Sequence, residues 1–369
     1  MVGAQSAPHS LLSDICSGSF AVKIIRYLLY AFALAFSSTA GAASNYSSLI
    51  VFGDSLSDPG NAAALTALGP YAAFFPPSPF PYDFRFTNGP TAPEYLAGIY
   101  AAPVVRGWPD PVGATNFAVG GALTGSGNYN VLIDSPSGLA AGFPAVSNTG
   151  ISQQIARYNP SGLNPANTLF LLWGGPNDVF YGFAQSQAGA SVDFNALASQ
   201  AVTNMSNNVL SLASLGARNI LVPNMPDLGL TPFALALGAT FAASATGVTN
   251  AFNAGLASAL SADRAALSAA GVRIFEFDTA QFIRNTVAHP PAGLTNVSAS
   301  CLSGGLAALA ANCAGYLYFD DVHPTTFANQ LLAQQFSLVA AVPEPGVYAL
   351  LACGLLLIGA GRIGRRAVI

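Results

Sequence analysis

Charged residues are scarce in this sequence of 369 residues. Asp, Glu, Lys and Arg together make up 8% of the chain, against about 25% in a typical soluble protein. The one lysine is Lys23, and the region 45–342 carries seven basic and fourteen acidic residues. A surface that follows a nucleic-acid backbone needs clustered Lys and Arg, so this composition argues against nucleic acid as a partner.

Cysteine is also rare, and its positions limit the chemistry of the chain. Cys16 and Cys353 lie close to the two ends, which leaves Cys301 and Cys313 in the middle. Two cysteines are too few to hold a structural metal ion, and we expect no metal and no organic cofactor. Thiols outside the cytoplasm usually pair, so in an exported chain we expect a disulfide between Cys301 and Cys313.

The N-terminal segment has the order of a secretory signal peptide. Lys23 and Arg26 precede an apolar stretch from Tyr27 to Phe36, and small residues follow up to Ala43. The apolar stretch is too short to span a bilayer stably. We therefore assign residues 1–43 to a leader with a signal peptide, and we expect the chain to be exported.

Residues 342–369 form a second candidate address signal. A Pro-Glu-Pro triplet precedes fifteen uncharged residues, Val347 to Gly361, and arginines close the chain. This three-part order resembles the PEP-CTERM sorting signal of Gram-negative bacteria that make extracellular polysaccharide. The resemblance implies transient anchoring in the inner membrane by a short transmembrane helix, recognition by sorting machinery, and delivery to the cell surface or extracellular matrix. A permanent membrane anchor stays open as the alternative.

Between these ends, residues 44–341 alternate apolar strand-like runs with helix-like segments. Predicted strands cover Ser48–Phe52, Thr168–Trp173, Asn219–Pro223 and Val272–Phe277, and predicted helices cover 61–68, 193–215, 248–270 and 325–339. This alternation predicts one three-layer, doubly wound α/β domain with a mostly parallel central sheet. The uncharged stretch 228–262 contains Asn and repeated Ser, Thr and Gly, so we interpret it as a loop and a surface helix rather than a membrane span.

The motif FGDSLSDPGN, Phe52 to Asn61, places Ser55 shortly after the first predicted strand. In parallel α/β folds, functional groups gather at the carboxyl ends of the strands. A serine nucleophile needs a base that is itself held by a third group. His323, in FDDVHPTTF, has Asp320 three residues earlier, and the three side chains fit the roles of a Ser-His-Asp triad. Each of these short motifs taken alone is also typical of an ordinary turn.

Acyl transfer also needs hydrogen-bond donors for the carbonyl oxygen of the substrate. Two further motifs offer them: GGPNDV brings the side-chain amide of Asn177, and NFAVGG brings a glycine turn that ends at Gly121. With the N–H of Ser55, these make three candidate oxyanion donors. Gly120 is the alternative donor if the turn is registered one residue earlier, and Asp321 is the alternative partner for His323.

The order of these motifs resembles that of the GDSL-type esterases and lipases of the SGNH hydrolase superfamily. The similar blocks are FGDSLSDPGN, NFAVGGA, GGPND and FDDVHPT, and the similarity extends from about Ser48 to Val339. The resemblance implies a flavodoxin-like fold. It also implies that Ser55 is the nucleophile, His323 the base and Asp320 its partner, with Gly121 and Asn177 as oxyanion donors beside the Ser55 amide.

We therefore expect an exported serine hydrolase that cleaves carboxylic esters through an acyl-enzyme intermediate. The substrate stays open between lipid-like esters and acylated extracellular polysaccharide, on which the protein would act as an O-acetyl esterase. A different class, a non-catalytic matrix-binding protein on the same scaffold, also stays open, because a fold alone does not confer activity. The aromatic and proline-rich stretch Pro70 to Phe86 is either an apolar lip of the site or packing against the sheet edge.

Overall fold

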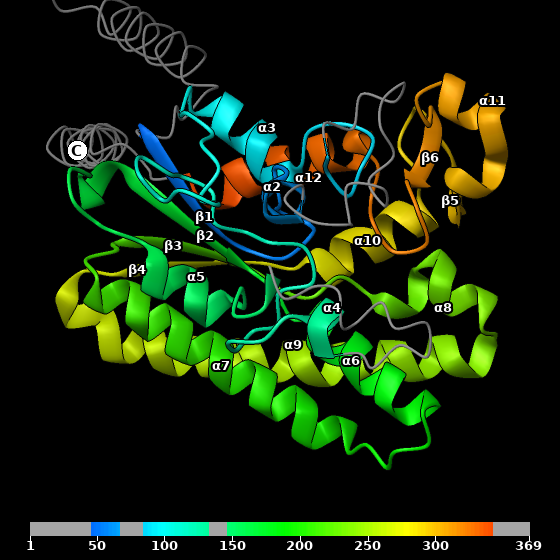
Figure 1. Ribbon diagram of the computed structural model, residues 1–369, viewed down its shortest axis with the longest axis horizontal. Helices are drawn as coiled ribbons and strands as arrows, with labels where there is room; N and C mark the ends of the chain where they lie inside the picture. Colours follow the sequence, from blue (N-terminus) through cyan, green and yellow to red (C-terminus); the bar gives the residue numbers. More distant parts are fainter. Residues whose placement is uncertain (1–45, 67–83, 133–145, 342–369) are drawn as a thin grey trace, which may run out of the picture. The chain divides into compact units, whose positions relative to one another are not determined.

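The computed structural model of the protein describes residues 46–66, 84–132 and 146–341 (Figure 1). The predicted signal peptide, the predicted sorting tail and most of the stretch Pro70 to Phe86 lie outside these ranges. The domain boundaries and the two terminal signals therefore stay predictions.

The central sheet has four parallel strands in the order β1-β2-β3-β4. They are β1 (Ser48–Gly53), β2 (Thr168–Trp173), β3 (Asn219–Pro223) and β4 (Arg273–Phe277). These bounds confirm the predicted strands to within one residue. Every residue of β2 is buried, as expected for a strand that is covered on both faces of a parallel sheet.

A fifth extended segment, residues 115–119, runs parallel to β1 on the side away from β2. Val51 donates its N–H to Thr115 O (2.8 Å) and accepts the N–H of Phe117 (2.8 Å), and Val119 donates to Gly53 O (3.1 Å). The first strand thus lies between the two segments that follow it in sequence. This arrangement is the topological switch point of a flavodoxin-like sheet, where ligands of such folds bind.

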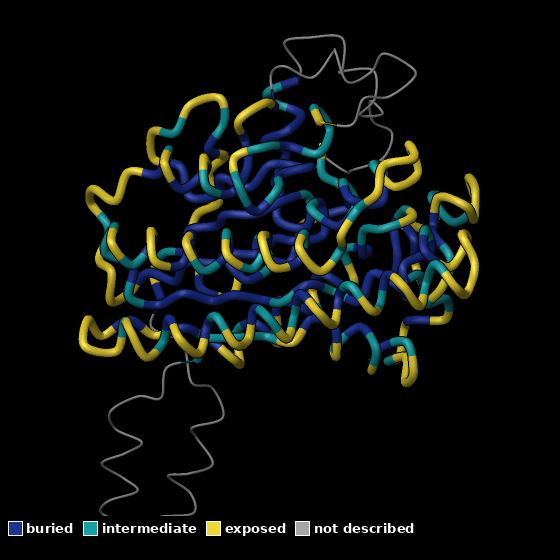
Figure 2. Tube along the Cα trace, turned by 90° about the horizontal axis from the view of Figure 1, so that it is seen from below, coloured by how far each residue is buried: buried dark blue, intermediate teal, exposed yellow. Residues whose placement is uncertain are grey.

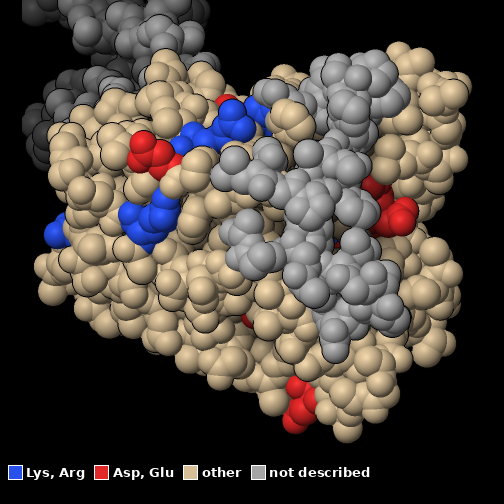
Figure 3. Space-filling model, in the orientation of Figure 1, with Lys and Arg blue, Asp and Glu red and all other residues tan. Residues whose placement is uncertain are grey.

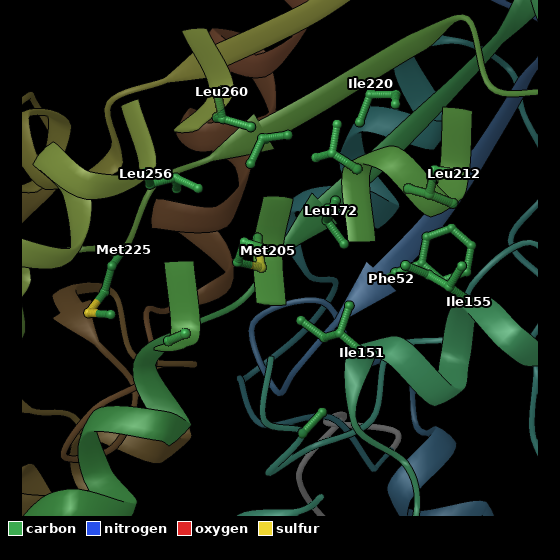
Figure 4. Close-up of a cluster of buried hydrophobic side chains, with 14 of the residues drawn as sticks. Phe52, Ile151, Ile155, Leu172, Met205, Leu212, Ile220, Met225, Leu256 and Leu260 are labelled. Carbon is green, nitrogen blue, oxygen red and sulfur yellow. The ribbon is translucent and has the colours of Figure 1, made fainter. Parts of the chain in front are cut away.

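Helices cover both faces of the sheet, which confirms the three-layer prediction (Figure 1). On one face lie α5 (Ile151–Arg157), α7 (Phe194–Ser214) and α9 (Ala239–Leu267), and on the other lie α3 (Ala92–Ile99) and α12 (Thr326–Val339). Alternate strand residues such as Phe52, Leu172 and Ile220 pack against Met205 and Leu256 of the first group (Figure 4). Figure 2 shows the resulting buried strands between helices whose outer turns are exposed.

The second face has its own aromatic contacts. The ring of Phe336 on α12 lies edge-on to Trp173 at the end of β2, with 5.5 Å between the centroids, and 5.0 Å from the ring of Phe277 at the end of β4. Both contacts are near the carboxyl edge of the sheet. They anchor α12, the helix that begins just after His323, against the strand ends.

Helix α9 corrects one sequence prediction, because it begins at Ala239 rather than near Val248. The extra turns, residues 239–247, combine four alanines, which favour a helix, with Thr, Ser and Gly, which favour it less. Tertiary contacts stabilise them: Ala245 is buried, and Thr246 donates its hydroxyl to Asp227 (2.7 Å). The helical segment ends just before Gly271, as predicted, and Gly271 has a left-handed conformation with φ 69°.

In the described residues we find no helix with the length and apolarity to cross a bilayer.

The remaining elements are short or peripheral. The α-helices are α2 (Asn61–Thr66), α4 (Tyr129–Leu132), α6 (Pro176–Gln187), α8 (Pro232–Ala236), α10 (Thr279–Ala288) and α11 (Gly305–Ala310). The 3-10 helices are η5 (Pro165–Asn167), η6 (Leu228–Leu230), η7 (Ser268–Ala270) and η8 (Leu302–Gly304). Charged side chains form only a few separate groups on the face shown in Figure 3.

A second, two-stranded parallel sheet precedes the last helix, and the sequence patterns did not predict it. Its strands are β5 (Leu294–Ser300) and β6 (Gly315–Tyr318). Cys301 and Cys313 form a disulfide in the connection between these strands, with an S–S distance of 2.06 Å. Both cysteines are buried in a small cluster with Phe319. The disulfide therefore links the two ends of the segment that connects β5 to β6, and β6 leads to His323.

Candidate active site

The segment after β1 is held so that Ser55 lies at the carboxyl edge of the sheet. Gly53 closes the strand, and a Cβ at this position would lie 2.5 Å from the carbonyl oxygen of Trp173, so only glycine fits. The buried Gln154 side chain accepts the N–H of Gly53 (2.9 Å) and donates to its carbonyl oxygen (2.8 Å). Ser55 follows two residues later and lines a cleft.

His323 and Asp320 form one compact turn between β6 and α12. Asp320 Oδ1 accepts the N–H groups of Val322 (2.9 Å) and His323 (2.7 Å). Its second oxygen, Oδ2, lies 2.7 Å from Nδ1 of the His323 ring. The side chain of Asp320 is 25% exposed, and that of His323 is 15% exposed. The carboxylate beside the imidazole is therefore that of Asp320. Asp321 takes part in a backbone hydrogen bond, in which its carbonyl oxygen accepts the N–H of Phe233 (2.9 Å).

The structure brings Ser55 and His323 together. Nε2 of the His323 ring lies 2.8 Å from Ser55 Oγ. The face of the same ring lies near Phe86, with 5.3 Å between the centroids. An Asp-His-Ser chain of contacts therefore runs through the imidazole, with one ring nitrogen for the carboxylate and the other for the hydroxyl, as in a catalytic triad.

The net effect of its surroundings raises the pKa of the His323 ring. Burial lowers the pKa of His323, but the charge and hydrogen bond of Asp320, together with the charge of Asp54, hold it above its ordinary value of 6.5. Burial raises the pKa of Asp320, yet the imidazole and two backbone N–H groups hold it below its ordinary value. Burial also raises the pKa of Asp54 to about 7, partly offset by the N–H of Leu56. The Asp320 carboxylate thus stabilises the imidazolium that proton transfer from Ser55 would create.

The two other predicted donors lie beside Ser55. Gly121 and Asn177 both line the cleft. Asn177, in the first turn of α6, uses its amide Nδ2 to donate to Ala122 O (3.1 Å), and this nitrogen carries a second hydrogen. Gly120 donates its N–H to Asp58 Oδ2 (2.8 Å). The N–H of Gly120 is therefore already engaged, whereas Gly121 lines the cleft.

The cleft has a volume of about 240 Å³ and mostly apolar walls. Its aromatic side chains are Phe86, Tyr129, Phe180 and Phe233. The rings of Phe180 and Phe233 meet edge to face, with 6.0 Å between the centroids. These residues come from four separate segments. Phe86 ends the aromatic and proline-rich stretch that was a candidate apolar lip, whereas the sequence motifs gave no signal for Tyr129, Phe180 and Phe233. Their convergence beside Ser55 forms an apolar pocket next to the polar site.

Among the described residues, no group of three or more His, Cys, Asp or Glu side chains is placed to hold a metal ion. His289 lies at the end of α10 and is not among the cleft residues. Of the described histidines, His323 is therefore the one that faces Ser55.

The sequence profile of one protein family, described as GDSL-like Lipase/Acylhydrolase, matches residues 49–336. The chain belongs to this family. The matched region begins one residue inside β1, before Ser55, and ends within α12, after His323. The residues that meet in the cleft therefore all lie within the family domain.

Several known proteins are similar to this chain over most of its length. It is 30% identical over 339 residues to an uncharacterised protein of the trpE-trpG intergenic region of Pseudomonas putida, covering 87% of this chain and 53% of that protein. It is 30% identical over 363 residues to esterase EstA of Pseudomonas aeruginosa, covering 86% and 51%. The chain thus spans about half the length of these two relatives. Identity to the phosphatidylcholine-sterol acyltransferase of Aeromonas hydrophila is 24% over 334 residues, covering 78% and 88%.

Proposed function

We propose that this protein hydrolyses carboxylic esters by nucleophilic catalysis through Ser55. One observation carries the proposal: the His323 ring joins Ser55 Oγ, at 2.8 Å, to the Asp320 carboxylate, at 2.7 Å. A serine hydroxyl is a weak nucleophile unless a base accepts its proton, and this contact supplies the base. Family membership supports the same chemistry.

The reaction proceeds in two matched halves. Nε2 of His323 accepts the Ser55 proton as Oγ bonds to the ester carbonyl carbon, and the carbonyl π electrons move to its oxygen. The tetrahedral intermediate collapses, the alcohol leaves with the proton from Nε2, and the acyl group stays on Ser55. Water then attacks the acyl carbon and gives a proton to Nε2 of His323. The second tetrahedral intermediate collapses, the bond from the acyl carbon to Oγ breaks, Oγ takes the proton back from Nε2, and the carboxylic acid leaves. Asp320 accepts from Nδ1 throughout and keeps Nε2 directed at the serine.

The negative oxygen of each tetrahedral intermediate receives hydrogen bonds from the amides of Ser55 and Gly121 and from the Asn177 side chain. Within the described residues, neither of the two backbone N–H groups donates to a protein acceptor. Fixed donors of this kind stabilise charge as it develops, because they need no reorganisation at the moment of reaction.

The walls of the cleft favour an ester with an apolar group. Phe180, Phe233 and Leu228 line one part of it, and burial of each additional methylene against such side chains contributes about 0.8 kcal/mol. The esterase and acyltransferase among the relatives are consistent with an acyl chain at this place. We therefore propose a short to medium acyl chain as the group that occupies the cleft.

The site of action that we propose is the cell surface or extracellular matrix of a Gram-negative bacterium, after export and sorting through the terminal signals. Support comes from the order of residues at both ends and from the Cys301–Cys313 disulfide, which is typical of oxidising compartments. Fractionation of cells that express the full chain, with the mass of the recovered protein, tests this part. Intact protein confined to the cytoplasm contradicts it.

Two measurements on the purified protein test the proposed reaction. The first is release of p-nitrophenol from a series of p-nitrophenyl esters of increasing acyl length, set against release of acetate from an acetylated polysaccharide. The second is reaction with a fluorophosphonate, followed by peptide mass mapping. We expect ester turnover and covalent mass on Ser55. Absence of both results contradicts an enzyme and favours a binding protein on the same fold.

A further inference from the structure

The peptide bond between Gly120 and Gly121 is held from outside the turn by Asn128. The Nδ2 group of Asn128 donates to Gly120 O at 2.9 Å. The side chain of Asn128 is 1% exposed, so water does not compete for this carbonyl from the Asn128 side. The orientation of the Gly120–Gly121 peptide therefore depends on one buried amide.

Peptide planarity converts this contact into the direction of the Gly121 amide. In a trans peptide the C=O and the following N–H point in opposite directions. Because Gly120 O faces Asn128, the N–H of Gly121 points away from Asn128, toward the cleft that Gly121 lines. Rotation of the same peptide by half a turn would place a carbonyl oxygen there, and this oxygen would repel an oxyanion.

The neighbouring amides of the turn are already engaged. Their acceptors are Asp58 for Gly120 (2.8 Å), Val119 O for Ala122 (3.0 Å), Gly127 O for Leu123 (3.0 Å) and Asp178 Oδ2 for Thr124 (3.0 Å). Within the described ranges, Gly121 is the residue of this turn whose N–H has no protein acceptor. The turn therefore presents one donor to the cleft.

Asn128 is itself fixed in one orientation. Its Oδ1 accepts the N–H of Asn130 (2.9 Å), and its Nδ2 also donates to the hydroxyl of Thr149 (3.0 Å). That hydroxyl gives its own hydrogen to Val146 O (2.6 Å), so it can only accept from Asn128. A flipped carboxamide would oppose donors to donors and acceptors to acceptors, which leaves Nδ2 as the group that faces Gly120 O.

Gly121 permits this close approach. Its φ of 82° lies in the left-handed region, and a Cβ at this position would lie 2.5 Å from Asn128 Oδ1. We propose that Asn128 is a positioning residue that directs the Gly121 amide into the cleft and so completes the oxyanion site. The proposal rests on the proposed ester hydrolysis, because it assigns to Asn128 the geometry of one donor in that reaction.

Asn128→Asp tests the proposal with little change of shape. The new carboxylate keeps an oxygen for the N–H of Asn130 but sets a second oxygen against Gly120 O, so the peptide rotates. Loss of one oxyanion donor costs about 10²-fold in turnover. We therefore expect kcat/KM for a p-nitrophenyl ester to fall by about 10²-fold, mostly through kcat, with KM changed by less than about 3-fold.

A second readout separates positioning from general damage to the fold. A trifluoromethyl ketone forms a tetrahedral oxyanion adduct on a reactive serine, so its affinity should fall in proportion to kcat/KM. Rates are divided by the active fraction from fluorophosphonate titration. Asn219→Asp is the matched control, because Asn219 is equally buried and donates to Pro165 O, Ala166 O and Thr168 O near the start of β2, at the opposite edge of the sheet. We expect the control to keep both values within about 3-fold of the unmodified protein.

A milder variant covers the case in which Asn128→Asp does not fold. Thr149→Val removes the second acceptor of Asn128 without changing the side-chain size, and we expect kcat/KM and ketone affinity to fall together by about 5-fold. The proposal is overturned if the folded Asn128→Asp protein has the same kcat/KM and ketone affinity as the unmodified protein. If Asn128→Asp does not fold, the same result in Thr149→Val overturns it. An unmodified protein without ester turnover and without labelling of Ser55 instead overturns the proposed function itself.

Discussion

Ser55 and His323 share a hydrogen bond of 2.8 Å although 268 positions separate them in the sequence. Ser55 follows the first strand of the central sheet, and His323 follows the last strand of the small second sheet. Their contact depends on the position of α12, whose Phe336 packs on the strand ends at Trp173 and Phe277. The Ser55–His323 hydrogen bond therefore forms only when the first strand and the last helix are both packed in the domain.

Replacement of the proposed nucleophile is the first prediction. Ser55→Ala removes the hydroxyl and leaves the His323–Asp320 pair in place, so turnover of a p-nitrophenyl ester should fall by at least about 10³-fold. Steady-state rates with matched circular dichroism spectra provide the measurement. A folded Ser55→Ala protein that keeps its activity places the nucleophile elsewhere.

The Asn177 side chain should contribute through the transition state. Asn177→Ala removes one oxyanion donor, and we expect kcat to fall by roughly 10²-fold with little change in KM. Asn195→Ala is a suitable control, because Asn195 is exposed at the start of α7 and is not among the cleft residues. Equal kinetics for Asn177→Ala and the control remove Asn177 from the oxyanion site.

The pH dependence should follow the imidazole of His323. The base must be neutral to accept a proton, and the net effect of its surroundings raises its pKa above 6.5. Activity should therefore fall as the pH is lowered through a value above 6.5. Asp320→Asn removes the carboxylate that raises the pKa, while burial still lowers it, so the acid limb of kcat/KM should move to lower pH and the maximum should decrease. An acid limb that stays in place in this variant contradicts the assigned pair.

Acyl-chain preference should depend on the aromatic wall of the cleft. Phe233→Ala removes a ring that faces Phe180, so we expect weaker turnover of short acyl esters and a relative gain for longer ones. Leu235→Ala lies on the same helix, α8, but its side chain is 41% exposed and outside the cleft, so it serves as the control. The ratio of kcat/KM for hexanoyl and butanoyl p-nitrophenyl esters measures the effect. The same ratio in both variants shows that the acyl group binds elsewhere.

The disulfide should stabilise the domain without taking part in the reaction. A cross-link across a short loop of this kind stabilises by about 3 kcal/mol in the chain-entropy account. We expect Cys301→Ser with Cys313→Ser to lower the free energy of unfolding in urea by up to this amount, and to leave kcat near that of the unmodified protein at low temperature. Titration of the mature protein with a thiol reagent provides a direct check, since two reactive thiols refute the bridge.

The sequence predicted those parts of the fold that local patterns encode. Apolar runs bounded by turn residues located β1 to β4, and the predicted helix ends at 215 and 270 lie within one residue of the ends of α7 and of η7, which follows α9. The strand β5 is mostly polar, LTNVSAS, and its partner β6 has four residues, so neither shows an apolar period. Residues 115–119 belong to the sheet through three hydrogen bonds to β1 that no local pattern specifies.

The sequence likewise predicted only those residues of the candidate site that stand in short motifs. Ser55, His323 and Asn177 stand in short motifs with a chemical meaning, and the structure brings them into one cleft. Phe180 and Phe233 are ordinary apolar residues of helices, and the side chain of Asn128 donates to Gly120 and Thr149, which lie 8 and 21 positions away. Their roles depend on contacts between distant segments, which pattern and spacing do not report.

Asp58 accepts four backbone N–H groups, from Gly60, Asn61 and Ala62 just after the nucleophile motif and from Gly120 in the glycine turn. The two loops that carry the Ser55 and Gly121 amides are therefore tied to a single carboxyl group. A shared anchor of this kind restricts motion of one loop relative to the other, so we expect the spacing between the two backbone donors to vary little.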